Sequence, residues 1–435
     1  MIGGGSTYTP DFIDAYIKLS DELPFDDITL MDINKERLKI LGGLVERMVR
    51  HVGLKAKVST TTDHEEAIEG SDFVFTTFRV GGMKHRIIDE ENAMKYGMVH
   101  NETTGPGGFS YALRQVPVAV EYARAVEKLA PDAFLVNVSN PSGILTEAQI
   151  RYSKTKVFGL CNDPGLIWDY VAYTLKVDRS RIKIDYLGFN HFAYVKRIWL
   201  DGKDVTERAI KEITAAMRAF KQGRWVHGGV NETERWFLKS LKPEVLELYG
   251  MYLQPYLRFY YHQNEMLKEE AEQTETRGET VTEIEAQLLK MYADPNLKVK
   301  PKELDQRGGG GYSLSALKTM AAIYNDENSI HIVNCRNNGT IQGLDDDASV
   351  EVPVVANKVG VFPLTIGKLP IEILPKLQLI KGYETLTAKA AMEGSKELAL
   401  KALCLHPLVP SFDVAKAFLE ETLKSHKEFL PNFFK

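Results

Sequence analysis

Apolar positions in the first half of the chain follow two alternating spacings. Short continuous apolar runs, bounded by polar or glycine-rich residues, predict β-strands at 26–33, 72–80, 133–141 and 156–164. Between them, apolar residues three and four positions apart predict helices at 35–53, 111–131 and 165–177. Strands that alternate with helices are typical of a parallel sheet covered by helices, so we expect an α/β fold of the doubly wound Rossmann type.

The pattern changes near residue 181. The segment 183–206 predicts a β-hairpin built on an Asp-Gly turn, and 206–300 is mostly helical and charged. Three more predicted strands follow at 329–339, 348–357 and 358–367, and the remainder is helical again. We therefore expect a nucleotide-binding domain over residues 1–175 and an α+β substrate-binding and C-terminal domain over 176–435.

Composition narrows the chemistry and the compartment. The 435 residues carry a formal net charge of −5, which gives no basic field for nucleic acid or an anionic membrane. No apolar run approaches the roughly 18 residues of a membrane span. Three scattered cysteines suggest no disulfide framework, and no apolar leader precedes the first glycines. These features predict a cytoplasmic protein that acts on small molecules.

Three consecutive glycines, Gly3 to Gly5, stand almost at the start of the chain. A flexible tag, a plain turn and a phosphate-binding loop are the competing interpretations. Pro10 and the helically spaced apolar residues behind it predict a helix directly after the loop, as phosphate binding at a helix N-terminus requires. Asp32, at the end of the next predicted strand, could accept a hydrogen bond from a ribose hydroxyl. Only two residues precede the glycines, so the first strand of the fold is curtailed.

Other polar residues follow predicted strands. Cys161 and His191 could share a divalent ion through a thiolate and an imidazole, although a core thiol and a satisfied histidine are the simpler interpretation. Tyr312 follows Arg307 and four glycines, where a loop could close over a substrate or simply precede a helix. A larger polar set follows the strands and could converge at their carboxyl ends: Arg79, Arg86, Asn101, Glu102 and Asn140.

The motifs together resemble a known family, the NAD-dependent glycoside hydrolases of family 4, and within it the bacterial 6-phospho-β-glucosidases. The segments that carry the resemblance are GGGSTYTP, FRVGG, ETTGPGG, SNPSG, GLCN, GFNHF, RGGGGYS and VNCRNNG. They span essentially the whole chain. The resemblance favours the metal-binding interpretation of Cys161 and His191 over the simpler one.

The resemblance implies roles for particular residues. Binding of NAD would involve Gly3, Gly4, Gly5, Ser6, Tyr8, Thr9 and Asp32. Mn²⁺ or another divalent ion would be held by Cys161 and His191, with Tyr312 as catalytic base and Asn162 in the catalytic site. The sugar phosphate would contact Arg86 and Asn140, with Arg336 as a further phosphate or substrate ligand.

One short segment bears on the substrate. Relatives that act on α-linked phosphosugars tend to have Asp directly after the metal cysteine, and Asn162 at this position favours β-linked substrates. The next residue is Asp163, where comparable 6-phospho-β-glucosidases often have a small or aliphatic residue. The effect of this carboxylate on the aglycone or its departure stays open.

The implied reaction differs from that of most glycosidases, which use two carboxylates. The sugar would be oxidised at C3 by NAD⁺ and lose its C2 proton to Tyr312. The aglycone would then leave, water would add at C1, and the hydride would return to C3. The expected substrate is a 6-phospho-β-glucoside such as cellobiose 6-phosphate or an aryl glucoside 6-phosphate, and we expect a homodimer or homotetramer.

Several alternatives remain. Within the family, these are a 6-phospho-α-glucosidase, an α-galactosidase or an α-glucuronidase. An NAD-dependent 2-hydroxy-acid dehydrogenase would share the nucleotide-binding half, but it would need no Cys/His metal pair and would accumulate NADH. A non-catalytic nucleotide sensor would tolerate the loss of Tyr312 and Cys161.

Overall fold

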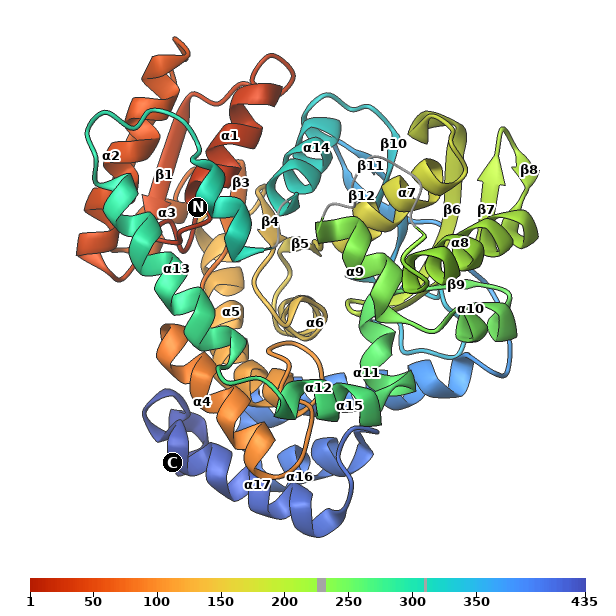
Figure 1. The fold of residues 1–435 in the computed structure, drawn as a ribbon. Helices are drawn as coiled ribbons and strands as arrows, with labels where there is room; N and C mark the ends of the chain where they lie inside the picture. Colours follow the sequence, from red (N-terminus) through yellow and green to blue (C-terminus); the bar gives the residue numbers. More distant parts are fainter. Residues whose placement is uncertain (225–231, 309–310) are drawn as a thin grey trace.

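A mixed β-sheet crosses the molecule and carries most of the predicted strands (Figure 1). The computed structural model describes residues 1–224, 232–308 and 311–435. The strands of this sheet are β1 (Asp27–Met31), β2 (Lys57–Thr61), β3 (Phe73–Thr76), β4 (Phe134–Asn137), β5 (Lys156–Gly159), β10 (Ser329–Arg336), β11 (Ser349–Asn357) and β12 (Gly360–Pro363). Strands β3, β4 and β5 are parallel neighbours, and β1 pairs in parallel with β2.

The expected first strand is reduced to a single residue. Ile2 forms parallel bridges to Met31 of β1 and to Thr76 of β3, and it is 1% exposed. It thereby joins the β1–β2 pair to the rest of the sheet and places Gly3 at the carboxyl edge of the strands.

Helices cover both faces of the sheet, which confirms the doubly wound α/β class. Along β4, Phe134 and Val136 pack into the core that also contains residues of α1 and α14 (Tyr312–Tyr324). Leu135, between them, packs on the opposite face with residues of α5. The helices of this half are α1 (Thr9–Leu19), α2 (Lys35–His51), α3 (His64–Ile68), α4 (Gly82–Lys95), α5 (Pro106–Leu129), α6 (Ser142–Tyr152) and α7 (Asp163–Thr174).

The three late strands extend the same sheet. Strand β10 pairs antiparallel with β5, β11 pairs with β10, and β12 pairs with β11. The sequence analysis assigned these strands to the second domain, because an apolar run does not reveal which strand it will pair with. The division at residue 175 therefore does not separate two sheets.

A second, smaller sheet contains the predicted hairpin. Its strands are β6 (Ile182–Phe189), β7 (Phe192–Leu200), β8 (Lys203–Asp204) and β9 (Tyr252–Leu253). The long hairpin turns at Asn190 and His191, because Phe189 pairs with Phe192. The predicted Asp201–Gly202 turn also forms a hairpin, a short one, because it connects β7 to β8 and these two strands pair antiparallel.

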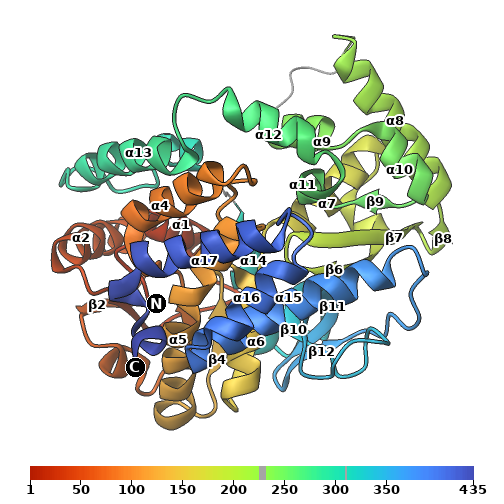
Figure 2. The same cartoon turned by 90° about the horizontal axis from the view of Figure 1, so that it is seen from below.

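The remaining helices are α8 (Thr206–Lys221), α9 (Glu232–Ser240), α10 (Pro243–Tyr249), α11 (Arg258–Tyr261), α12 (Gln263–Ala271), α13 (Arg277–Tyr292), α15 (Leu374–Glu393), α16 (Lys396–Leu405) and α17 (Phe412–Ser425). They lie in three places: α8 to α12 lie near the second sheet, α13 packs on α2 and α4, and α15 to α17 lie at the lower side of Figure 1. Figure 2 shows α15, α16 and α17 side by side, and α15 also contacts α5 and α6. This packing attaches the end of the chain to the nucleotide-binding half.

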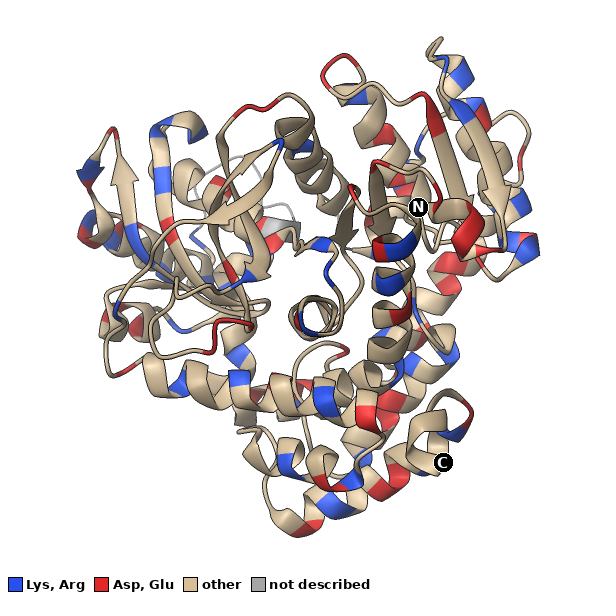
Figure 3. Ribbon diagram, turned by 180° about the vertical axis from the view of Figure 1, so that it is seen from behind, with Lys and Arg blue, Asp and Glu red and all other residues tan. Residues whose placement is uncertain are grey.

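Charges of both signs are interspersed along the elements in Figure 3, as the small net charge suggests. In the described part of the chain, no helix has the length and apolar character that crossing a membrane requires.

A buried ion pair connects α4 and α5. The Arg114 guanidinium donates to both carboxylate oxygens of Asp89, at 2.8 and 2.6 Å, and both side chains are at most 2% exposed. Burial alone would raise the pKa of Asp89, but Arg114 lowers this pKa to about 2. The carboxylate is therefore charged and depends on its partner.

We expect Arg114→Ala to lower the free energy of unfolding by about 3–5 kcal/mol, because the buried Asp89 carboxyl group would lose its main partner and would have to stay charged without it or take up a proton. Urea denaturation measures this loss. The matched control is Arg50→Ala, which breaks the exposed Arg50–Glu46 pair and should leave the midpoint within experimental scatter. Equal stability of the two variants would contradict the prediction.

Candidate active site

The structure brings Cys161 and His191 together. Cys161 follows β5 at its carboxyl end, and His191 lies in the turn between β6 and β7. The Cys161 Sγ atom is 3.6 Å from His191 Nε2, and both residues are buried. His191 has a φ of 63°, a left-handed conformation that few non-glycine residues adopt, and the two-residue hairpin turn imposes it.

A third donor lies beside this pair. The Asp163 Oδ2 atom is 4.0 Å from His191 Nε2, and the donor atoms of Cys161, Asp163 and His191 all lie within 4.8 Å of one another. Gln254 donates its amide N–H to the same Asp163 oxygen at 2.6 Å. The sequence analysis noted Asp163 without assigning it to the metal, although the Cys-x-Asp spacing could have raised that possibility.

The electrostatics of the three donors suit a divalent cation. Burial, together with Asp163 and Glu351, raises the pKa of the Cys161 thiol well above its usual value. Burial and Glu351 raise the pKa of Asp163 to about 7, and burial lowers the pKa of His191 to about 4. A neutral imidazole is a metal ligand, and a cation would stabilise the thiolate and the carboxylate. Thiolate, imidazole and carboxylate together fit a borderline ion such as Mn²⁺ or Zn²⁺.

Neighbouring groups fix the orientation of the donors. The Thr103 hydroxyl is 2.8 Å from His191 Nδ1, so a proton on Nδ1 leaves the Nε2 lone pair directed at the cluster. Asn162 is buried between the two donors of the CND segment, with its Oδ1 3.6 Å from Cys161 Sγ. The predicted catalytic-site residue Asn162 therefore lies at the metal donors.

The Glu351 carboxylate holds the hairpin turn in place through hydrogen bonds. It accepts hydrogen bonds from the Tyr186 hydroxyl at 2.8 Å, from Asn334 at 3.0 Å and from Asn190 at 3.3 Å. It is 1% exposed, and burial raises its pKa to about 7. No local motif in the sequence marks Glu351, because its partners come from three different strands or turns.

Two tyrosines approach the donors. The Tyr256 ring stacks on the His191 imidazole, with ring centroids 3.9 Å apart and planes 2° from parallel. Burial, Asp163 and Cys161 raise the pKa of Tyr256, and Arg86 opposes this rise. Tyr312 begins α14, and burial, Cys161 and Tyr256 raise its pKa as well. No motif in the sequence marks Tyr256. Residues 309 and 310 of the glycine-rich loop before Tyr312 lie outside the described residues.

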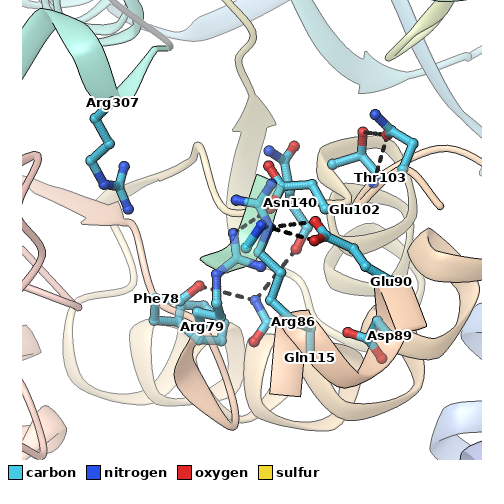
Figure 4. Close-up of polar contacts among 12 residues, drawn as sticks. Phe78, Arg79, Arg86, Asp89, Glu90, Glu102, Thr103, Gln115, Asn140 and Arg307 are labelled. Atoms are coloured by element: carbon cyan, nitrogen blue, oxygen red, sulfur yellow. Dashed lines mark hydrogen bonds and ion pairs between the residues drawn. The ribbon is translucent and has the colours of Figure 1, made fainter. Parts of the chain in front are cut away.

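A cluster of arginines and carboxylates lies at the ends of β3 and β4 (Figure 4). Arg79 and Arg86 each contact Glu102 Oε2, at 2.7 and 3.0 Å, and Arg86 also donates to Glu90. Burial opposes ionisation of Glu102, but the two guanidinium groups lower its pKa to about 2. Figure 4 shows Asn140 beside Glu102 and Arg86. The predicted convergence of Arg79, Arg86, Glu102 and Asn140 is present.

Arg336 does not join this cluster. Strand β10 runs antiparallel to β5 with Asn334 opposite Gly159, so Arg336 lies toward the amino end of β5, away from Cys161. Its guanidinium pairs with Asp347 and donates to the Ile150 carbonyl at 3.1 Å. The structure therefore does not support the expected contact between Arg336 and the substrate. The expectation failed because the antiparallel direction of β10 cannot be read from the sequence.

The glycine loop sits against the end of β1. A Cβ on Gly5 would lie 2.7 Å from Asp32 Oδ2, and one on Gly4 would lie 2.7 Å from Leu30 Cβ. Only glycine allows this approach, which lets the Gly5 N–H donate to Asp32 at 3.0 Å. Ser6, Tyr8 and Thr9 continue into the N-terminus of α1. A glycine loop, a helix N-terminus and an adjacent carboxylate fit the pyrophosphate and ribose of a dinucleotide.

Comparison with known proteins identifies the family. The family 4 glycosyl hydrolase model matches residues 1–177, and the model of that family's C-terminal domain matches residues 186–409. A protein of Bacillus subtilis (strain 168) named probable 6-phospho-beta-glucosidase is 42% identical over 439 residues, covering 100% of this chain and 97% of that protein. The chain belongs to glycosyl hydrolase family 4.

Solved structures of this family share the fold. A 6-phospho-beta-glucosidase of Thermotoga maritima, determined with NAD and glucose-6-phosphate, has a TM-score of 0.88 at 34% identity and covers 99% of this chain and 98% of its own. A second structure of that enzyme, with manganese, NAD⁺ and glucose-6-phosphate, has a TM-score of 0.87 at 33% identity, with the same coverage. The malate dehydrogenase of Plasmodium falciparum shares the fold alone, with a TM-score of 0.51 at 13% identity, covering 90% of this chain and 98% of its own.

The electrostatics of this family 4 site predict pH-dependent metal binding. Because the metal-free protein holds the Cys161 thiol and part of Asp163 protonated at neutral pH, binding should release protons. Mn²⁺ affinity should rise by about tenfold per pH unit for each proton released, between about pH 6 and 8. Isothermal titration calorimetry in buffers of different ionisation enthalpy counts the protons.

Two variants and a control test the assignment of the donors. Cys161→Ser and His191→Ala should remove measurable Mn²⁺ binding while NAD⁺ still binds. Asp32→Ala should show the reverse pattern, with weakened NAD⁺ binding and unchanged Mn²⁺ binding. Mn²⁺ affinity that is independent of pH in the wild type would contradict the protonated state inferred for the donors.

Proposed function

We propose that this family 4 enzyme hydrolyses 6-phospho-β-glucosides to glucose 6-phosphate and the aglycone, with NAD⁺ and a divalent ion such as Mn²⁺. The observation that carries the proposal is the position of a buried Cys–Asp–His donor set beside Asn162, with the nucleotide loop and an arginine cluster at the ends of the same parallel strands. A plain dehydrogenase needs no such donor set.

Identity to relatives supports the β-linked substrate. Relatives named 6-phospho-beta-glucosidase in Bacillus subtilis and Escherichia coli are 42% and 33% identical to this chain. A Bacillus subtilis relative named maltose-6'-phosphate glucosidase is 29% identical. Asn162, rather than an aspartate, after the metal cysteine is consistent with the same substrate class.

The arginine cluster suits the 6-phosphate group. Arg79 Nη1 is buried without a hydrogen-bond partner among the described residues, and Arg86 lies 3.0 Å from the same Glu102 oxygen that Arg79 contacts. Guanidinium groups bind phosphate through strong charge-assisted hydrogen bonds. We infer that Arg79 and Arg86 bind the phosphate and that Asn140 holds a sugar hydroxyl beside them.

The cofactors and the side chains have separate tasks. When bound, NAD⁺ would accept a hydride from C3 of the sugar, and the divalent ion would polarise the resulting carbonyl. Cys161 and His191 hold the ion, while Asp32 and the glycine loop hold the nucleotide. A tyrosine takes the proton from C2, and burial of the site limits access of water to the oxidised sugar.

We propose Tyr256 as this base, in place of the Tyr312 that the sequence suggests. Tyr256 lies flat on the ligand His191, and its charged neighbours include both the metal donors and the Glu102–Arg86 pair. We infer that Tyr256 lies within reach of both the metal donors and the Arg86–Glu102 pair, and that it can approach C2 of the sugar. Tyr312 also has Cys161 and Asp163 among its neighbours, together with Tyr8 of the nucleotide loop, but not the Arg86–Glu102 pair. Tyr312 stays the sequence-based candidate.

The compartment and the assembly stay predictions. Cys161, Cys335 and Cys404 are all free thiols, and a thiolate ligand persists in a reducing cytoplasm. Light scattering after size-exclusion chromatography tests the expected homodimer or homotetramer.

The activity is tested with p-nitrophenyl β-glucoside, with and without a 6-phosphate. Release of p-nitrophenol should require the 6-phosphate, Mn²⁺ and a catalytic amount of NAD⁺, and NADH should not accumulate with product, because the hydride returns to the sugar. The corresponding 6-phospho-α-glucoside is the matched control and should react far more slowly. NADH formed in step with product would support the dehydrogenase instead.

The base is tested by hydrolysis in D₂O. The wild-type product should carry deuterium at C2, since the proton removed there exchanges with solvent before it returns. Tyr256→Phe should lower kcat by about 10²- to 10⁴-fold, the usual contribution of a general base. Tyr312→Phe, compared directly, should cost less. A large loss in Tyr312→Phe with near-normal turnover of Tyr256→Phe would return the role to Tyr312.

A further inference from the structure

Asp163 occupies an unusual place for a helix-starting aspartate. It is the first residue of α7, where a carboxylate usually faces solvent or caps the free N–H groups of the helix. Its side chain is instead only 13% exposed and is directed toward the Cys161–His191 pair. Pro164 and the start of the helix fix the backbone at Asp163, so the local fold determines that its side chain points inward.

The buried carboxylate has no cationic side chain to balance it. Among the described residues, its nearest potentially cationic group is the His191 imidazole, with Oδ2 4.0 Å from Nε2. The other close acid is Glu351, which adds negative charge to the same region. A carboxylate removed from water is costly unless a cation compensates it. A metal ion between the three donors would provide that charge.

One neutral side chain holds the carboxylate in place. Gln254 is 1% exposed; its amide N–H donates to Asp163 Oδ2 at 2.6 Å, and its amide oxygen accepts from the Tyr256 N–H at 2.8 Å. The same residue thus fixes Asp163 and the segment that stacks Tyr256 on His191.

We propose that Asp163 is a third protein ligand of the divalent ion and that Gln254 is the positioning residue for its carboxylate. The inference rests on the proposed function only in that it requires a metal at this site. Carboxylate oxygen favours Mn²⁺ and other hard ions, whereas thiolate and imidazole favour softer ions such as Zn²⁺ and Cd²⁺. Asp163 therefore shifts the preference of the site toward Mn²⁺.

The experiment measures binding of Mn²⁺ and of Cd²⁺ to the full-length protein by calorimetry, with no substrate present. Asp163→Asn keeps the size of the side chain and removes its charge. It should lower Mn²⁺ affinity by about tenfold or more and Cd²⁺ affinity by less, so that the ratio of the two affinities falls. Gln254→Ala should lower Mn²⁺ affinity by about tenfold, as loss of a positioning hydrogen bond does.

The matched control is Asp169→Asn, further along α7, which removes an exposed carboxylate paired with Arg179. It should leave both affinities unchanged, and NAD⁺ affinity and the melting temperature should verify that each variant is folded. Unchanged Mn²⁺ affinity in folded Asp163→Asn would overturn the inference, whereas absence of Mn²⁺ binding in the wild type would overturn the proposed function.

A measurement on the wild type covers the case in which Asp163→Asn does not fold. A crystal structure of the Mn²⁺-loaded enzyme should place an Asp163 oxygen at coordination distance, about 2.2 Å from the ion. An ion held by Cys161 and His191 with both Asp163 oxygens beyond about 3 Å would also overturn the inference.

Discussion

The candidate site depends on the hydrogen bonds that the buried Glu351 carboxylate accepts. It accepts hydrogen bonds from β6, from β10 and from the β6–β7 turn, and thereby holds the smaller sheet against the larger one. Because His191 is the next residue after Asn190, this contact sets the distance between His191 and Cys161. A shift of the hairpin by one residue would turn His191 away from β5.

The site contains buried acidic groups in two neighbouring regions. Positive charge balances these groups in a different way in each region. At Glu102, two guanidinium groups balance the carboxylate and leave donor capacity for an anionic substrate group. At Cys161 and Asp163, the described residues provide the imidazole, the Gln254 amide and the further acid Glu351 but no Lys or Arg partner, so the compensation falls to a cation. The contrast separates the proposed phosphate-binding region from the proposed metal-binding one within a single set of strand ends.

Gln254 and Tyr256 connect the two regions. Gln254 contacts Asp163 directly, and Tyr256 stacks on His191 and has Arg86 and Glu102 among its charged neighbours. Both residues lie in the short segment after β9. That segment contains no sequence motif that marks it as part of the site. Side chains that lie between the two regions have to come from such a segment, since the parallel strands supply their side chains from one edge only.

The sequence by itself determined the α/β class, the glycine loop with Asp32, and the family, because these depend on local periodicity and on contiguous motifs. It also singled out Cys161, His191, Arg86 and Asn140, which follow predicted strands. The tertiary structure alone decided that β10 to β12 join the first sheet, that Arg336 points away from the site, and that Asp163, Glu351 and Tyr256 belong to it. These facts depend on pairing between distant segments, and neither strand direction nor the partner of a buried side chain is encoded in a local pattern.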